Sequence, residues 1–286
     1  MICTKRIKLR STFRSASVLI ASLFLAFALV SAATSAEQKP LPVSIAKVSV
    51  NWPMYRFNSA RTASLNFAPQ CIATGKRKWV FPAEGGIDSS PAIYNGLIFV
   101  GCDDWNVYAV DERSGNMVWR AKLGGQVKSS PAVDGTMVIV GCEDSNLYAL
   151  DSANGKEIWK FKAGGRLSSS PCTVNGTTYV CSWDAALYAI DSKTGTLKWK
   201  FAGADPTNGR MTSSPAYYDG TVYVTSHDGF AYAVNALDGT LKWKFKTADK
   251  IFSSALVMNN IVYFGSWDQN FYAVDALTGK TVWTYK

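Results

Sequence analysis

The sequence predicts an all-β protein, a β-propeller made of four-stranded antiparallel blades. The first observation behind this prediction is a long repeat, in which tryptophan returns at intervals of 40, 40, 40, 44 and 40 residues. The second is a series of short runs rich in Val, Ile, Tyr, Phe and Trp, separated by turn residues about every 8 to 12 positions. A period near 40 residues containing four strands is typical of propeller blades. The recurring tryptophans are Trp79, Trp119, Trp159, Trp199, Trp243 and Trp283.

Five complete copies of the repeat follow one another from about Ser89 to Lys286. Each copy contains four strand-like runs, which are too short for helices. One four-stranded sheet cannot bury both of its faces alone, so the copies must stack on one another. The longer interval of 44 residues arises in Ala204 to Arg210, where Asp, Pro, Asn and Gly predict an extended surface loop.

Two kinds of turn support this arrangement. Pairs of Asn or Asp with Gly are expected to join the first strand of a copy to the second, because both residues of such a turn need positive φ. These pairs are Asn95-Gly96, Asp134-Gly135, Asn175-Gly176 and Asp219-Gly220. A glycine four residues before each tryptophan is expected to relieve the same strain between the third and fourth strands.

The first 36 residues have the layout of a secretory signal peptide. Five basic residues precede an uncharged apolar run from about Val18 to Val30, and small residues follow from Ser31 to Ala36. We expect cleavage after Ala36, with an uncleaved anchor as the rival interpretation. The domain prediction is therefore a signal peptide at 1–36, an N-terminal segment with a partial blade at 37–81, and five blades at 82–286. The expected location is the periplasm or the cell exterior.

Charge and cysteine content narrow the possible partners. The whole chain has a net charge of +9, but the first 36 residues hold five of the 30 basic residues and none of the 21 acidic ones. The remaining +4 is too small and too scattered to indicate a nucleic acid partner. Five cysteines remain after Cys3, an odd number, and no Cys-x-x-Cys motif indicates zinc. A disulfide between Cys172 and Cys181 is geometrically awkward, because Cys172 is expected opposite Tyr179.

The repeat resembles the pyrroloquinoline-quinone-like, or quinoprotein-like, propeller family. The resemblance rests on the motif Ala-x-Asp-x-x-x-Gly-x-x-x-Trp, which runs from Ala109 to Trp119 and returns in later copies, with Asn235 in place of Asp in one of them. It covers nearly all of residues 50 to 286. In that family the tryptophan packs between neighbouring blades. The resemblance therefore implies structural docking roles for Trp119, Trp159, Trp199, Trp243 and Trp283.

Two branches of this family imply different functions. Binding scaffolds include the propeller lipoprotein of the outer-membrane β-barrel assembly machinery, whereas the quinoprotein dehydrogenases bind pyrroloquinoline quinone beside calcium. This sequence has no lipobox near the apolar run and no adjacent cysteines of the kind the dehydrogenases carry. We therefore expect a non-catalytic binding protein without a cofactor rather than an enzyme. A quinone-dependent dehydrogenase, with pyrroloquinoline quinone and calcium, is the alternative.

The number of blades is open at this stage. Residues 71–79 copy only the last strand and turn of a repeat. Either residues 43–81 form a divergent sixth blade, or the chain is a truncated or incomplete ring, which association with another chain could complete. We favour the second interpretation.

Several recurring polar residues are expected to be structural. A carboxylate stands between the second and third strands of every copy, where Asp bonds its own backbone two residues on. Ser-Ser-Pro recurs where the innermost strand starts. His227 is the only histidine, and no Gly-x-Ser-x-Gly elbow accompanies it, so a turn role is favoured over catalysis. The recurring carboxylates are Asp104, Asp144, Asp184, Asp228 and Asp268.

One set of loops varies in a way that the fold does not require. The loops before the first strand and those between the second and third strands emerge on the same side of a propeller. At matching positions, copies three to five pair a basic residue with an aromatic ring, whereas copy two pairs Gln126 with Glu143 and copy one pairs Gly86 with Asp103. We predict a ligand-binding patch for an anionic or aromatic group, a peptide segment or a sugar. Its residues are Arg166, Arg210, Lys250, Trp183, His227 and Trp267.

Overall fold

A computed structural model describes residues 54–56, 58–60 and 76–286 of the 286-residue chain. The predicted signal peptide at 1–36, Cys71 and most of the N-terminal segment lie outside the described residues. The chain divides into a unit from Met1 to Val48 and a unit from Ser49 to Lys286. All of the described residues belong to the second unit. Its described residues contain no helical segment with the length and apolar character needed to cross a bilayer.

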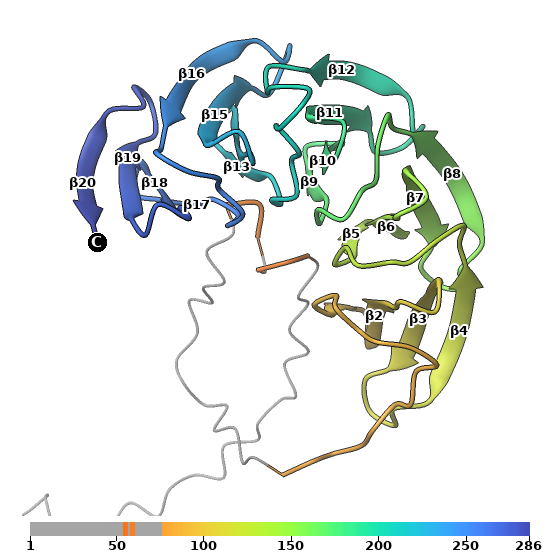
Figure 1. The fold of residues 1–286 in the computed structure, drawn as a ribbon. Helices are drawn as coiled ribbons and strands as arrows, with labels where there is room; N and C mark the ends of the chain where they lie inside the picture. Colours follow the sequence, from red (N-terminus) through yellow and green to blue (C-terminus); the bar gives the residue numbers. More distant parts are fainter. Residues whose placement is uncertain (1–53, 57, 61–75) are drawn as a thin grey trace, which may run out of the picture. The chain divides into compact units, whose positions relative to one another are not determined.

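Twenty strands form five four-stranded antiparallel sheets, each in chain order, as the repeat predicts (Figure 1). The first two blades contain β1 (Ala92–Tyr94), β2 (Leu97–Gly101), β3 (Asn106–Asp111), β4 (Met117–Lys122), β5 (Ala132–Asp134), β6 (Met137–Gly141), β7 (Asn146–Asp151) and β8 (Glu157–Lys162). The third and fourth contain β9 (Cys172–Val174), β10 (Thr177–Ser182), β11 (Ala186–Asp191), β12 (Leu197–Phe201), β13 (Ala216–Tyr218), β14 (Thr221–Thr225), β15 (Phe230–Asn235) and β16 (Leu241–Lys246). The fifth contains β17 (Leu256–Met258), β18 (Ile261–Gly265), β19 (Phe271–Asp275) and β20 (Thr281–Tyr285). The propeller prediction is confirmed.

The hairpins between the first and second strands have two-residue loops. Asn95 and Gly96 both have positive φ, as predicted for such a turn. The prediction for the second blade was wrong by one residue. Asp134 still belongs to β5 and pairs with Met137, so the loop is Gly135-Thr136. There only Gly135 has positive φ, because a turn with glycine first leaves its second residue in an ordinary conformation.

Serine hydroxyls connect the first strands of neighbouring blades. These strands lie next to one another in chain order, from β1 to β5, β9, β13 and β17. The Ser130 N–H donates to Ser170 Oγ of the next blade at 3.0 Å, and the same bond recurs along the series. The Ser129 hydroxyl instead bridges the N–H and carbonyl of Gly141 in its own blade. The recurring serines are therefore structural, as expected.

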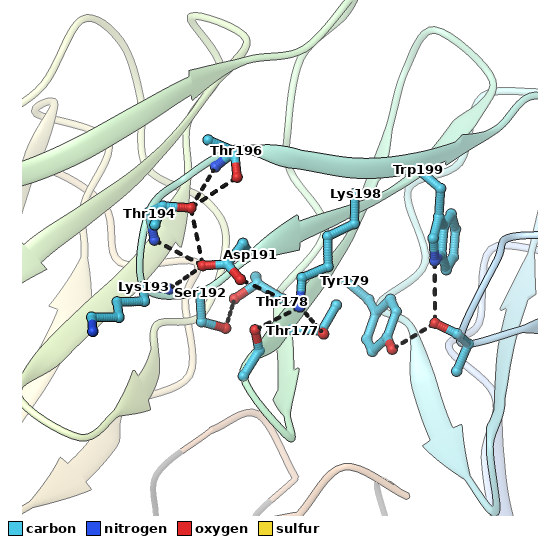
Figure 2. Close-up of polar contacts among 12 residues, drawn as sticks. Thr177, Thr178, Tyr179, Asp191, Ser192, Lys193, Thr194, Thr196, Lys198 and Trp199 are labelled. Carbon is cyan, nitrogen blue, oxygen red and sulfur yellow. Dashed lines mark hydrogen bonds and ion pairs between the residues drawn. The ribbon is translucent and has the colours of Figure 1, made fainter.

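Tryptophan joins each blade to the next. Trp159 Nε1 donates to the Ser192 carbonyl at 3.0 Å, and its ring covers Gly195 of the following blade. Figure 2 shows Trp199 of the third blade beside Tyr179, and both side chains donate to the carbonyl of Ala236 in the fourth blade at 3.1 Å. The glycine before each tryptophan therefore serves two purposes. It adopts positive φ, and it lets the preceding blade's indole approach the backbone.

The two ends of the series differ from its middle. Trp79 occupies the usual tryptophan position on the first blade: its Nε1 donates to the Glu112 carbonyl at 3.0 Å and its ring covers Gly115. Phe81 adds an edge-to-face contact with Tyr108. No strand occurs in the described residues of 43–81, the range considered for a sixth blade. At the other end, Trp283 is 43% exposed.

Residues near the N-terminus of this unit contact the innermost strands. The Tyr217 N–H of β13 donates to the Ser59 carbonyl at 2.7 Å, and the Val257 N–H of β17 donates to the Ala60 carbonyl at 3.1 Å. Met54 is buried. Within the described sheets, no strand pairs by hydrogen bonds with the inner edge of a first strand. The Ser59 and Ala60 carbonyls therefore accept backbone N–H groups that sheet pairing leaves open.

The cysteines in the described residues are all buried thiols, and none forms a disulfide. Cys172 lies opposite Tyr179, as predicted, so Cys181 is not its direct partner across the strands. Cys102 and Cys142 are fully buried, which agrees with their expected role as small apolar residues.

An Asp–Tyr pair closes the turn between the second and third strands in every blade. In the second blade, Asp144 Oδ1 accepts the Asn146 N–H at 2.9 Å, and Asp144 Oδ2 accepts the Tyr148 hydroxyl at 2.6 Å. The bond from the backbone N–H two residues on was predicted from the sequence, whereas the bond from the tyrosine hydroxyl was not. Burial raises the pKa of Asp144, but the hydrogen bonds from Tyr148 and Asn146 outweigh it, and the net pKa is lowered. The recurring carboxylates are structural.

Replacing Tyr148 by phenylalanine should lower the free energy of unfolding by about 1–2 kcal/mol, because a partly buried carboxylate oxygen loses its donor. A carboxyl group with a lowered folded pKa contributes stability above its unfolded pKa and loses it as pH falls through the folded pKa. Without the hydroxyl the Asp144 pKa rises toward its unfolded value. The variant should therefore lose less stability than the wild type between pH 7 and pH 3. Urea unfolding followed by circular dichroism across this range measures both effects, and an unchanged pH slope contradicts the assignment.

Candidate functional site

The two sets of loops that were predicted to share one side do meet in every blade. The Trp183 N–H donates to the Arg166 carbonyl at 3.0 Å, the His227 N–H to the Arg210 carbonyl at 3.1 Å, and the Trp267 N–H to the Lys250 carbonyl at 2.9 Å. The matching bonds in the first two blades join Asp103 to Gly86 and Glu143 to Gln126. The predicted register of these loops is therefore correct. We call this side of the propeller the loop face.

A third residue completes each loop pair, and sequence reasoning missed it. It stands two positions after the basic residue and contacts the ring in its own blade. Trp183 Nε1 donates to Ser168 Oγ at 2.7 Å, and Thr212 Oγ1 lies 2.8 Å from His227 Nε2. In the fifth blade Phe252 takes this place and stacks on Trp267, with ring centroids 4.5 Å apart. The sequence did contain a signal for Phe252, because this position is aromatic only in the fifth copy and is polar or charged in the other four.

Two guanidinium groups lie over one indole on the loop face. The Arg166 guanidinium carbon is 5.2 Å from the Trp183 ring centroid, and that of Arg210, from the next blade, is 4.9 Å away. Arg166 also pairs with Glu143 at 3.1 Å. Such cation–π contacts orient the guanidinium groups while leaving their edges available for hydrogen bonds. We call Arg166, Trp183 and Arg210 the arginine clamp.

An aromatic stack continues across the next two blades. The His227 and Phe252 ring centroids are 4.0 Å apart, and Phe252 stacks in turn on Trp267. Burial, followed by the charges of Lys250 and Arg210, lowers the pKa of His227 below its ordinary value. The imidazole is therefore neutral at pH 7. His227 is half-buried, so the structure gives it a packing role beyond that of a solvated turn residue.

The other side of the loop face carries acids. Asp103 and Glu143 occupy the positions that hold aromatic rings in the later blades, and Asp88 pairs with Lys128 at 3.5 Å. The Asp103 Oδ1 atom is buried and has no hydrogen-bond partner among the described residues. At the positions of these rings the loop face is therefore divided, with acids in the first two blades and aromatic side chains in the last three.

The extended loop at 204–210 forms one wall of a polar hollow between the fourth and fifth blades. Asp205 braces this loop by accepting the Thr207 N–H at 2.8 Å, and the Asp205 N–H donates to Asp228 Oδ2 at 3.1 Å. Asp249 and Lys250 line the hollow from the fifth blade. The side chain of Lys250 thus lies among several carboxylates, a setting that differs from that of the arginine clamp. The lining residues are Asp205, Asn208, His227, Asp228, Lys246, Ala248, Asp249 and Lys250.

Five of the six residues predicted from sequence form two groups, and the sixth, Lys250, lines the polar hollow instead. Arg166, Trp183 and Arg210 form the arginine clamp, and His227 and Trp267 join through Phe252. The side chain of Arg210 lies over Trp183 of the preceding blade, a contact that its backbone pairing with His227 did not indicate.

The described residues do not assemble a donor set for a calcium-bound quinone. Calcium takes six to eight oxygen ligands, usually with several carboxylates. Across residues 54–56, 58–60 and 76–286, no group of three or more His, Cys, Asp or Glu side chains is arranged to hold a metal ion. The hydroxyls of Ser129 and Ser170, which flank the innermost strands, are already engaged in hydrogen bonds. The described residues therefore show no carboxylate cluster for the calcium ion of such a site.

Solved structures share the fold at low sequence identity. BamB from Moraxella catarrhalis is 19% identical with a TM-score of 0.65, covering 73% of this chain and 67% of that one. The quinohemoprotein alcohol dehydrogenase from Comamonas testosteroni is 18% identical with a TM-score of 0.69, covering 82% of this chain and 49% of that one. A quinohemoprotein alcohol dehydrogenase from Pseudomonas putida HK5 is 17% identical with a TM-score of 0.68, covering 82% of this chain and 48% of that one. The chain spans about half the length of these dehydrogenases.

Sequence comparison identifies the family. No curated protein matches the chain. A family model described as outer membrane protein assembly factor BamB matches residues 103–284, which include most of the five blades and all of the residues in the arginine clamp and the aromatic stack. The family prediction, a quinoprotein-like propeller similar to the propeller lipoprotein of the β-barrel assembly machinery, is confirmed. The chain belongs to the BamB family of propellers with pyrroloquinoline-quinone-like repeats.

Proposed function

We propose that this chain is an exported, non-catalytic binding protein that uses its loop face to dock a protein partner in the periplasm or outside the cell. The family match supports a binding or scaffold role at the level of the fold. The charge and aromatic pattern of the loop face supports a protein as the ligand. The predicted signal peptide at 1–36 supports export.

The observation that carries the proposal is the presence of the arginine clamp and the aromatic stack on one face. Side-chain contacts join the third blade to the fourth within the clamp and the fourth to the fifth within the stack, and the bond from the His227 N–H to the Arg210 carbonyl links the two groups. The repeat does not need these side chains, because the first two blades fold with acids at the ring positions and with Gly86 or Gln126 at the basic ones. Arginine and tryptophan are enriched among the residues that dominate binding energy at protein interfaces. An exposed surface of this composition is therefore best explained by a partner.

Replacing Arg210 and Trp267 together by alanine should weaken binding to a partner by at least tenfold, about 1.4 kcal/mol or more. The partner is first identified by crosslinking in a periplasmic extract, and its affinity is then measured with purified proteins by calorimetry. Both side chains are exposed, so the double variant should unfold at the same urea concentration as the wild type.

A matched control lies at the other end of the blades. Lys193 and Leu237 stand in turns between third and fourth strands, and Leu237 is 87% exposed. Replacing this cation and this apolar residue by alanine should leave affinity unchanged. Equal affinity of the Arg210 and Trp267 double variant and the wild type would remove the loop face as the binding surface.

A quinone-dependent dehydrogenase is the candidate from a different class, and the dehydrogenase neighbours favour it at the level of the fold alone. Titrating the protein with pyrroloquinoline quinone and calcium, followed by visible absorbance, tests it directly. We expect no saturable binding and no dye-linked oxidation of alcohols. Saturable binding with alcohol oxidation would replace the proposed function by the enzymatic one.

A further inference from the structure

We propose that the loop face recognises an acidic polypeptide segment, in which a carboxylate binds Arg210 of the arginine clamp and a nearby apolar side chain packs on Phe252 and Trp267. This inference rests on the proposed function, because it names the chemistry of the partner at the same surface. It goes further by dividing that surface into an anion subsite and an apolar subsite.

The anion subsite follows from an imbalance within the arginine clamp. Arg166 and Arg210 lie over the same Trp183 ring, and both are exposed. Arg166 is paired with Glu143 at 3.1 Å, whereas Arg210 has no ion pair and no side-chain hydrogen bond among the described residues. A guanidinium group presents donors in a planar fork that matches a carboxylate. Because Trp183 already holds Arg210 in place, little freedom remains to be lost when a carboxylate binds.

The hollow beside the clamp explains why the carboxylate belongs at Arg210 rather than at Lys250. Lys250 lines the hollow together with Asp205, Asp228 and Asp249. Those carboxylates would repel an incoming anion at this position. Among the three predicted basic residues, Arg166 is paired with Glu143, and Lys250 lines a hollow that holds three carboxylates and Lys246. Arg210 is therefore the one that lies over an indole and has no ion pair among the described residues.

The apolar subsite follows from the stack in the fifth blade. Phe252 is 38% exposed and Trp267 is 63% exposed, although they stack on each other. His227 supports Phe252 from the fourth blade, with ring centroids 4.0 Å apart. A large ring that is held by its neighbours and still faces water offers contact area at a small cost in conformational freedom. An aromatic or aliphatic side chain is the complementary group.

A polypeptide satisfies both subsites together. The arginine clamp joins the third and fourth blades and the aromatic stack joins the fourth and fifth, so a ligand that uses both must extend across blades. A small carboxylate would fill one subsite and leave the other exposed.

Three labelled peptides test the inference by fluorescence anisotropy with the full protein. The first alternates glutamate with phenylalanine, acetyl-Gly-Glu-Phe-Glu-Phe-Glu-Gly. The second carries glutamine in place of each glutamate, and the third carries alanine in place of each phenylalanine. We expect the first peptide to bind at least tenfold more tightly than either of the others.

Variants then assign each preference to its subsite. With R210Q, the difference between the glutamate and glutamine peptides should shrink to less than twofold, whereas the preference for phenylalanine over alanine should persist. With W267A, the preference for phenylalanine over alanine should shrink to less than twofold, whereas the preference for glutamate over glutamine should persist. Lys193→Gln, a charge change at the opposite end of the blades, should alter neither ratio. Circular dichroism and the urea midpoint confirm that each variant is folded.

The outcomes separate this inference from the proposed function. If the glutamate and glutamine peptides bind equally well and W267A weakens both, the loop face binds polypeptides but the acidic specificity is wrong. If R210Q leaves the glutamate preference intact, Arg210 is not the anion subsite. If no peptide binds at millimolar concentration while the crosslinked partner still depends on Arg210 and Trp267, the extended acidic segment is wrong and the proposed function stands. If neither peptides nor a partner depend on these residues, both proposals fail.

Discussion

Replacing Trp159 by alanine should lower the free energy of unfolding by about 3–5 kcal/mol, the range for removing a large buried aromatic side chain. Trp159 is 9% exposed and packs in the core between the second and third blades with Leu147, Val180 and Ile190. Its Nε1 donates to the Ser192 carbonyl at 3.0 Å, so the variant also leaves that carbonyl without this donor. In a stack of repeats, each interface contributes to the stability of both units it joins.

Trp283 provides the matched control because it occupies the same position in the repeat. It is 43% exposed, and in the part of the chain that the structure describes its Nε1 donates to no carbonyl. Trp283→Ala should therefore cost less than half as much as Trp159→Ala. Urea unfolding followed by far-ultraviolet circular dichroism measures both variants. Equal losses would show that burial between blades is not what makes Trp159 important.

Replacing Gly155 by alanine should cost about 2–5 kcal/mol, because two penalties add. Gly155 has a φ of +73°, a conformation that costs an L-residue about 1–2 kcal/mol. A methyl group there would lie 2.6 Å from Trp119 Cε3, so the indole or the turn must move, at a further cost of about 1–3 kcal/mol. The turn and the tryptophan contact therefore compete for the same space.

Gly135 separates the two penalties. Its φ is +60°, and no heavy atom lies within 4 Å of the position a methyl group would take. Gly135→Ala should therefore cost only the conformational part, about 1–2 kcal/mol. The two alanine variants are compared in the same urea titration. If they lose equal stability, the tryptophan contact does not restrict residue 155, and the close approach of indole to glycine has no energetic role.

The period of the sequence determined most of the fold, for a reason that is local. Each copy carries its own strand pattern and its own turn residues, so the four strands, the Asx turns and most hairpin loops follow from nearby residues. The hairpin loop of the second blade was predicted one residue too early. Asp134 resembles the Asn and Asp of the other turns, but the register of β5 and β6 pairs it with Met137, so the loop is Gly135-Thr136.

The same period also aligned the loops of the candidate site. Because matching positions of successive copies occupy matching places, the sequence alone predicted the pairings of Arg166 with Trp183, Arg210 with His227 and Lys250 with Trp267. These pairings within single blades did not include the side-chain contacts between adjacent blades, such as that of Arg210 with Trp183. Long side chains reach into neighbouring blades, and the repeat alone does not specify their direction.

The sequence by itself determined that this chain is a propeller of tryptophan-docked blades and that one side of it varies in charge. The tertiary structure decided which of those residues act together. Arg210 lies over Trp183 of the preceding blade, Phe252 joins His227 to Trp267, and Lys250 lines a polar hollow. These contacts form between blades, where side-chain direction and the unique loop at 204–210 set the geometry. Periodicity describes what the blades share, whereas a binding surface depends on where they differ.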